Sequence, residues 1–240
     1  MHNLGKVLGT AATVLTFNLI CSNFAQASTI AVDPNGGGIP VASSDATLGW
    51  SFTVNNTVAL DELLLFDLNS DGFRGNHDVG VWDTNSTTPL LQTTFSAGTS
   101  DPTLASADSR GIWRVINVPN LQLNPNTTYV IGYYNPADGF DATVASSSVF
   151  GSLNLTTSPD IVFGEARQAS SVASLTRPDD VSTSRNPGWF GPSFTTTPVE
   201  AEPVPEPATI LGLGSVAALG MGRLLKKKSA RKSQKDTTKS

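Results

Sequence analysis

The sequence predicts an all-β protein whose body is a jelly-roll-like β-sandwich, flanked by an N-terminal signal helix and one short C-terminal transmembrane helix. Between Ser28 and Pro198, apolar residues recur with period two, and Asn, Asp, Gly, Pro, Ser and Thr separate the runs. No amphipathic helix of convincing length interrupts them, and many short strands are typical of sandwiches. We divide the chain into a signal peptide at residues 1–27, a β-sandwich body at 28–197, a proline-rich linker at 198–207, a transmembrane sorting helix at 208–225 and a basic cytoplasmic tail at 226–240.

Alternating apolar residues predict the individual strands of the body. In residues 48–54 they are Leu48, Trp50, Phe52 and Val54, whereas residues 58–66 are apolar on both faces, as in a fully buried strand. Further strands are predicted in residues 77–83, 89–95, 112–118, 128–134 and 188–194. In residues 112–118, Ile112, Ile116 and Val118 share one face. In residues 128–134, Tyr129, Ile131 and Tyr133 share one face. The glycine run at residues 36–38 is expected to be flexible coil.

The charge of the chain is unevenly distributed. Residues 28–207 hold 19 Asp and Glu against six Arg and no Lys, whereas residues 223–240 hold eight Lys and Arg and one Asp. A nucleic-acid interface needs clustered Lys and Arg to neutralise phosphates. We therefore expect no nucleic-acid partner for the acidic body.

The first 27 residues have the layout of a secretory signal peptide. Lys6 and the terminal amine supply positive charge, residues 7–21 are mostly apolar, and Ala25 and Ala27 form the small-x-small site that signal peptidase recognises. We expect cleavage before Ser28, in preference to a buried N-terminal helix or a lipoprotein signal at Cys21. Since Cys21 is the only cysteine, the mature protein would lack disulfides and thiol nucleophiles.

A proline-rich segment, an apolar run and a cationic cluster follow one another near the C-terminus. Residues 208–222 carry no charge, and as a helix they span about 22 Å, so that crossing the bilayer core needs the extension by Leu224 and Leu225. The basic residues that follow stay cytoplasmic, which places the body outside. Prolines at 203, 205 and 207 keep the preceding stretch extended and exposed.

This C-terminal segment resembles the PEP-CTERM sorting tail of bacterial exported proteins. The matching residues are Val204, Pro205, Glu206 and Pro207, the apolar segment 210–221 and the basic cluster from Arg223 onward. The resemblance implies that an exosortase, a membrane protease-transpeptidase, recognises and removes the tail and that the body reaches the cell surface or the exopolysaccharide matrix. The polar extension at residues 229–240 departs from the family pattern. An ordinary membrane anchor that is never processed is the alternative.

The body also resembles a domain of unknown function that often precedes such tails. The similar stretches are Leu48–Phe52, Asp67–Gly72, His77–Asp83, Pro89–Leu91 and Leu121–Gly132. The resemblance implies an all-β domain and brings no established activity with it.

The segment Asp67–Asp78 copies the spacing of a calcium-binding loop. It reads D-x-N-x-D-G and has a carboxylate at its twelfth position, so that Asp67, Asn69, Asp71 and Asp78 would be the oxygen ligands. The shorter Asp at the last position, Arg74 within the loop and the strand-like flanks depart from that pattern. An ordinary inter-strand loop made by turn residues is the competing interpretation. Calcium is the one cofactor that the sequence suggests.

No catalytic constellation emerges from the sequence, and the protein is expected not to be an enzyme. His77 is the only histidine of the mature chain, and motifs of serine hydrolases and zinc proteases are absent. Asp138 with Asp141 and Asp179 with Asp180 are interpreted as loop residues. The aromatics Trp50, Trp82, Trp113, Tyr133, Tyr134 and Trp189 are interpreted mainly as core, with sugar-stacking platforms as the alternative.

These observations predict an exported, non-catalytic protein of the cell surface or extracellular matrix that contributes adhesion or exopolysaccharide association. The alternative is an extracellular carbohydrate-active enzyme of the glycoside hydrolase type, which needs two carboxylates about 5 to 10 Å apart. A purely structural filler is a further reading that the sequence does not separate from the first.

Overall fold

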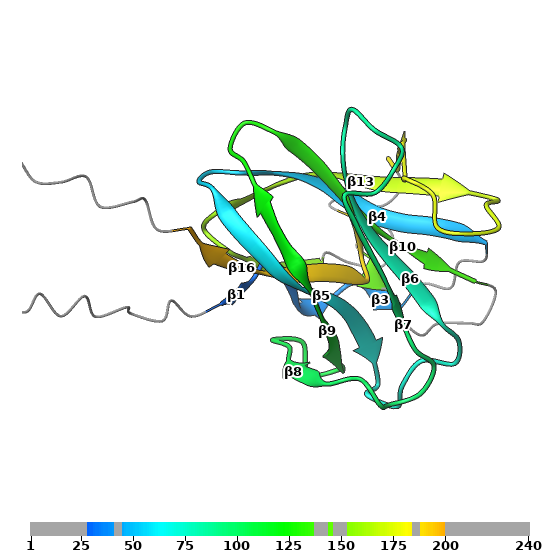
Figure 1. The fold of residues 1–240 in the computed structure, drawn as a ribbon. Helices are drawn as coiled ribbons and strands as arrows, with labels where there is room; N and C mark the ends of the chain where they lie inside the picture. The colour runs from blue at the N-terminus through cyan, green and yellow to red at the C-terminus, as the bar shows by residue number, and fades with distance from the viewer. Residues whose placement is uncertain (1–27, 41–44, 137–143, 146–152, 184–187, 200–240) are drawn as a thin grey trace, which may run out of the picture. The chain divides into compact units, whose positions relative to one another are not determined.

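A computed structural model describes residues 28–40, 45–136, 144–145, 153–183 and 188–199 (Figure 1). Within these ranges the chain forms strands and no helix, which confirms the all-β body. The described ranges contain no helix long and apolar enough to cross a membrane. The predicted signal helix and the predicted helix at 208–225 lie outside them. Residue contacts divide the chain into the units Met1–Pro198 and Val199–Ser240.

The described strands alternate with short turns along the body. Their bounds are β1 Thr29–Ile30, β2 Val32–Gly37, β3 Ile39–Pro40, β4 Ala46–Val54, β5 Val58–Leu68, β6 His77–Asp83, β7 Leu91–Phe95, β8 Thr103–Ala105, β9 Gly111–Leu123, β10 Thr128–Asn135, β11 Val144–Ala145, β12 Leu153–Thr157, β13 Ile161–Ser170, β14 Asp180–Val181, β15 Trp189–Phe190 and β16 Pro192–Pro198.

Two large sheets hold most of the strands. One has five strands in the order β1-β16-β5-β9-β8, and the other has six in the order β14-β13-β4-β10-β6-β7. The strand pairs in both sheets are antiparallel. A three-stranded sheet, β15-β11-β3, and a two-stranded sheet, β12-β2, complete the described part of the body.

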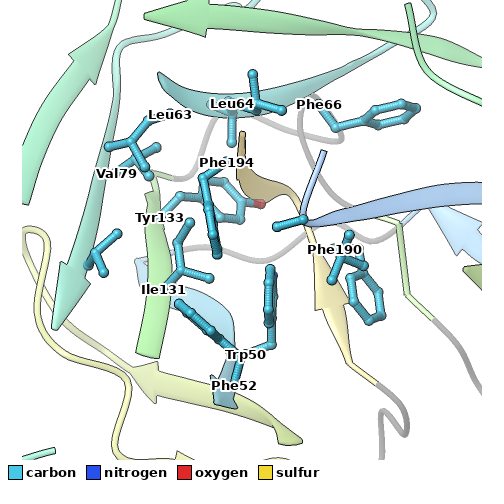
Figure 2. Packing of buried hydrophobic residues seen from close by; sticks show 14 of the residues in the cluster. Trp50, Phe52, Leu63, Leu64, Phe66, Val79, Ile131, Tyr133, Phe190 and Phe194 are labelled. Atoms are coloured by element: carbon cyan, nitrogen blue, oxygen red, sulfur yellow. The ribbon is translucent and has the colours of Figure 1, made fainter. Parts of the chain in front are cut away.

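Aromatic side chains from the two large sheets meet in one core (Figure 2). The ring of Phe194 on β16 lies 4.9 Å from that of Phe52 and 6.0 Å from that of Trp50, both on β4. Each large side chain removed from water contributes several kcal/mol, at about 25 cal/mol per Å² of apolar surface. This packing joins the sheets without any disulfide, since the chain has one cysteine.

The predicted inward faces are confirmed on most of the expected strands. Leu48, Trp50, Phe52 and Val54 are buried along β4, and Tyr129, Ile131 and Tyr133 are buried along β10. On β9, the buried apolar residues are Trp113, Val115 and Leu123, and Trp113 packs edge-on against Phe66 with ring centroids 5.3 Å apart. Ile112, Ile116 and Val118, which were predicted to share a face, are half-buried, and Ile116 and Val118 pack against the core.

The expectation of coil at residues 36–38 is wrong for Gly36 and Gly37. Gly36 and Gly37 belong to β2, which pairs with β12, and the φ angles of Gly36, Gly37 and Gly38 are 79°, 74° and 63°. Glycine adopts such left-handed backbone without a steric penalty. Arg110, from the turn before β9, donates hydrogen bonds to the Gly37 and Gly38 carbonyls and so fixes this segment.

Both ends of the described body lie at the same end of the molecule. Thr29 on β1 pairs with Thr196 on β16, and β16 ends beside the start of β5, where Pro198 pairs with Val58 (Figure 1). Because only three residues separate the end of β4 at Val54 from Val58, the first residue of β4, Ala46, lies at the opposite end. Nine strand residues separate these ends by about 30 Å.

Candidate functional site

The residues predicted for export and sorting fall almost entirely outside the described ranges. Ala25, Ala27 and the Val204–Pro207 motif lie there, as do residues 226–240. Ser28, the expected first residue of the mature chain, is exposed just before β1. β16 ends at Pro198, the first residue of the predicted linker. These assignments therefore remain predictions.

Asp67, the first predicted calcium ligand, is fully buried at the end of β5. Its carboxylate accepts hydrogen bonds from the Gly72 backbone N–H at 3.0 and 3.2 Å. Its Oδ2 also accepts from Nε and Nη2 of Arg114, at 2.9 and 2.6 Å. Protein donors thus surround this carboxylate, and an ion would have to displace some of them.

The other predicted calcium ligands differ in exposure. Asn69 and Asp71 are exposed in the turn after β5, where Asn69 has a φ of 73°. Asp78 is half-buried on β6, and its Oδ1 accepts the Thr94 hydroxyl at 2.5 Å. No group of three or more His, Cys, Asp or Glu side chains arranged for a metal occurs within the described ranges. The calcium site remains a prediction.

His77 lies in the core and packs between aromatic rings. It is fully buried, with ring centroids 5.1 Å from Phe73 and 5.8 Å from Tyr133. Its Nδ1 lies 3.2 Å from the Tyr134 carbonyl oxygen. These contacts agree with a structural role for His77 in the core.

The aromatic residues considered as sugar platforms separate into two groups. Five of them are buried and form core: Trp50, Trp82, Trp113, Tyr133 and Trp189. Tyr134 alone in this set is half-buried. It follows Tyr133 on β10, so its side chain points to the outer face of the six-stranded sheet.

Tyr134 lines a surface hollow with a volume of about 480 Å³. The described residues around it are Asp45, Tyr134, Ser171, Val172 and Ala173. The Tyr134 hydroxyl donates to Asp45 Oδ1 at 3.4 Å, and the Val172 N–H donates to the Asp45 carbonyl at 2.8 Å. Asp45 and Ser171 both have left-handed backbone, with φ of 51° and 58°. Such strained positions gather where the fold constrains a site.

One wall of the hollow belongs to the β13–β14 connection, residues 171–179, which crosses the outer face of the six-stranded sheet. Glycines make room for it, since an added Cβ on Gly132 would lie 3.0 Å from Pro178 and one on Gly80 would lie 3.1 Å from Leu175. Arg177 fastens the connection through a hydrogen bond to the Ser86 carbonyl at 2.6 Å.

The chemistry of the hollow suits a hydroxyl-bearing ligand. The Asp45 carboxylate is exposed and can accept hydrogen bonds, and the Tyr134 side chain offers both an aromatic surface and a hydroxyl. Its volume lies in the range typical of small-molecule sites, about 300 to 1,000 Å³. Among its described lining residues, Asp45 supplies the one carboxylate, whereas glycoside hydrolysis needs a pair.

A second polar group lies where β2 meets the turn before β9, and it was not anticipated from the sequence. Asp33 is buried and accepts from Trp113 Nε1 at 2.8 Å, Ser106 Oγ at 2.6 Å and the Ala107 N–H at 2.8 Å. Nearby, Arg110 Nε donates to Asp108 Oδ1 at 2.9 Å. These bonds satisfy buried polar atoms and connect the N-terminal strand to the body.

The ionisation of Asp108 is shaped by burial and by Arg110. Burial opposes its charge, but hydrogen bonds from the side chain and backbone of Arg110, the guanidinium charge and a Gly36 N–H outweigh burial. The pKa of Asp108 therefore lies below its ordinary value of 3.8. The hydrogen bond to Asp108 likewise raises the pKa of Arg110.

Comparisons with family models, with curated proteins and with solved structures found no match to this chain.

Proposed function

We propose that this chain is an exported, non-catalytic protein of the cell surface or extracellular matrix whose β body associates with exopolysaccharide. The observation that carries the proposal is the pairing of Tyr134 with the exposed Asp45 carboxylate in one hollow. Sugars present apolar C–H faces that pack on aromatic rings and hydroxyls that donate to carboxylates. Adhesion of cells to their matrix would follow from this binding.

The finer fold assignment, a jelly-roll β-sandwich, is supported by strand order. Two sets of four neighbouring strands can be chosen from the two large sheets, and these eight strands can be numbered from one to eight along the chain. The first set, β1-β16-β5-β9, then has the order one, eight, three, six. The second set, β4-β10-β6-β7, has the order two, seven, four, five. We infer a jelly roll from that order, an architecture shared by lectin domains and many others. The fold alone does not determine the function.

The location proposed for the protein rests on its two end segments. Signal peptidase would cleave before Ser28, the helix at 208–225 would hold the body outside the inner membrane, and an exosortase-type enzyme would process the tail near Pro207. β1 and β16 pair at one end of the body, whereas Asp45 precedes β4 at the other end. The hollow would then lie away from the attachment point.

Binding of exopolysaccharide by the mature protein recovered from its cells tests this proposal. Asp45→Asn should weaken binding roughly ten- to hundredfold, because a hydrogen bond to a charged group contributes about 1.5–3 kcal/mol. Tyr134→Phe keeps the ring and should bind nearly normally, whereas Tyr134→Leu should not. Asp180→Asn, at an exposed position on β14, is the matched control.

Two results would contradict the proposal. The first is equal binding by the wild type, Asp45→Asn and Tyr134→Leu, with unchanged melting temperatures. The second is release of new reducing ends by the wild-type protein that a single Asp substitution abolishes, which would instead establish the carbohydrate-active enzyme.

A further inference from the structure

A smaller hollow, of about 270 Å³, lies where β13 and β14 diverge. Its described lining residues are Gly164, Glu165, Ala166, Val181, Ser182 and Thr183. It shares no described lining residue with the Asp45–Tyr134 hollow. Its volume is just below the usual range for drug-sized ligands, so it suits a single small ring.

A β-bulge in β13 builds this hollow. The pairing register with β4 shifts between Phe163 and Ala166, and the Ser51 hydroxyl accepts the Glu165 N–H at 2.9 Å. An added Cβ on Gly164 would lie 2.6 Å from Ser51 Oγ, so the backbone approaches too closely for a side chain. Bulges of this kind re-aim a side chain. Here Glu165 turns toward Arg167, whose Nη2 lies 2.8 Å from its Oε2.

Ser182, one of the residues that line the hollow, has a buried hydroxyl without a protein partner in the described part of the chain. The residue is 6% exposed, and its Oγ has no hydrogen-bond partner among the described residues. The buried Nε of Arg167 has none there either, and Arg167 pairs across the strands with Val181. Buried polar atoms without partners destabilise a fold, and an exception calls for an explanation such as a bound ligand.

We propose that this hollow is a second saccharide subsite, which binds one neutral sugar residue. Ser182 Oγ and the half-exposed Glu165 carboxylate hydrogen-bond with ring hydroxyls, and the exposed side chain of Val181 packs on an apolar C–H face. A neutral ligand is favoured because Arg167 balances the charge of Glu165. The inference rests on the proposed polysaccharide binding and extends it to a site on the edge of the six-stranded sheet.

Ser182→Ala separates a ligand contact from a structural role. Because the hydroxyl lacks a protein partner, its removal should leave the melting temperature of the free protein unchanged or raise it. The same substitution should weaken saccharide binding about tenfold, since one hydrogen bond to the ligand is lost. A structural hydroxyl would give the reverse pattern, a lower melting temperature with normal binding.

The measurement uses saturation-transfer NMR on the mature protein with D-glucose, D-galactose, D-mannose and N-acetyl-D-glucosamine as probes. The proteins compared carry Asp45→Asn, which weakens binding in the first hollow. In that background we expect a signal from at least one probe, its loss on adding Ser182→Ala or Glu165→Gln, and its retention on adding the control Ser100→Ala, which changes an exposed residue. Equal signals in all four proteins, or a lower melting temperature of Ser182→Ala, would overturn the inference. Absence of signal from every probe would overturn it too, because water alone would then fill the hollow.

Exopolysaccharide binding by the same variants distinguishes this inference from the function on which it rests. Normal polysaccharide binding by Ser182→Ala and Glu165→Gln, with loss in Asp45→Asn, rejects the second subsite and leaves the proposed function standing. No polysaccharide binding by the wild type rejects the proposed function itself.

Discussion

Arg114 on β9 and Asp67 at the end of β5 form an ion pair inside the body. Arg114 Nη2 lies 2.6 Å from Asp67 Oδ2, and the two side chains are 6% and 0% exposed. Arg114 Nη1 also donates to the Thr99 carbonyl at 3.0 Å. One guanidinium therefore joins two turns to the five-stranded sheet, in a part of the chain that has no cysteine to form a disulfide.

Removing one member of this pair should destabilise the protein strongly. Asp67→Ala leaves the Arg114 charge buried and uncompensated, which costs about 3–5 kcal/mol of unfolding free energy. Urea unfolding followed by circular dichroism measures the change. The matched control is Asp179→Ala, because Asp179 pairs with Arg177 while its side chain is 59% exposed, and such pairs contribute about 0–1 kcal/mol. Similar losses in the two variants would contradict this account.

Asp108 should make stability depend on pH in the acid range. Its folded pKa lies below 3.8, so the unfolded chain takes up the proton first as the pH falls. The stabilisation is fully present above the unfolded pKa and is lost as the pH falls through the folded pKa. Unfolding free energies of wild type and Asp108→Asn should differ at neutral pH and converge below about pH 3.8. A difference that stays constant as the pH falls well below 3.8 would argue against the Asp108–Arg110 interaction.

Gly36 offers a clean measure of backbone strain. Its φ is 79°, and an added Cβ would meet no atom within 4 Å. Gly36→Ala should therefore cost about 1–2 kcal/mol through conformation alone, and Gly36→Asn less, because Asn tolerates left-handed backbone. Thermal unfolding of both variants checks the order. Equal stability of Gly36→Ala and the wild type would show that residues 36–38 adopt another conformation in solution.

Calcium binding at residues 67–78 gives a fourth prediction. An ion that binds only the folded protein stabilises it by mass action. Millimolar Ca²⁺ should therefore raise the melting temperature of the mature protein, and Asp71→Ala, which alters an exposed residue of the loop, should abolish the rise. Asp180→Ala is the control. An unchanged wild-type melting temperature would contradict calcium binding and leave Arg114 and the Gly72 N–H as the partners of the Asp67 carboxylate.

The strands that sequence predicts correctly are those whose inward positions alternate without interruption. On β4 and β10 the large apolar residues recur at every second position, although most of the residues between them are buried as well, so the period of two can be recognised in the sequence. β13 was missed, because its bulge after Phe163 resets the alternation and places Glu165 and Arg167 in the middle of the strand. A search for apolar residues at a fixed period of two does not detect a strand in which a bulge shifts the alternation.

The hollow around Tyr134 could be only partly anticipated. The parity of β10 distinguishes Tyr133, which points inward, from Tyr134, which points outward. The neighbours of Tyr134 come from distant segments, since Asp45 precedes β4 and Ser171 follows β13. They meet because Tyr134 pairs with Thr47 and Thr47 with Ala169. The pairing register of β4 with β10 and β13 cannot be derived from a single sequence.

The central claim is that the folded body works outside the cytoplasm after processing at both ends. Intact-mass analysis of the protein recovered from the exopolysaccharide fraction of its cells tests it most directly. We predict a chain that begins at Ser28 and ends near Pro207, with or without an attached group. Recovery of the uncleaved 240-residue chain from the cytoplasmic fraction, and of none from the matrix, would contradict the account.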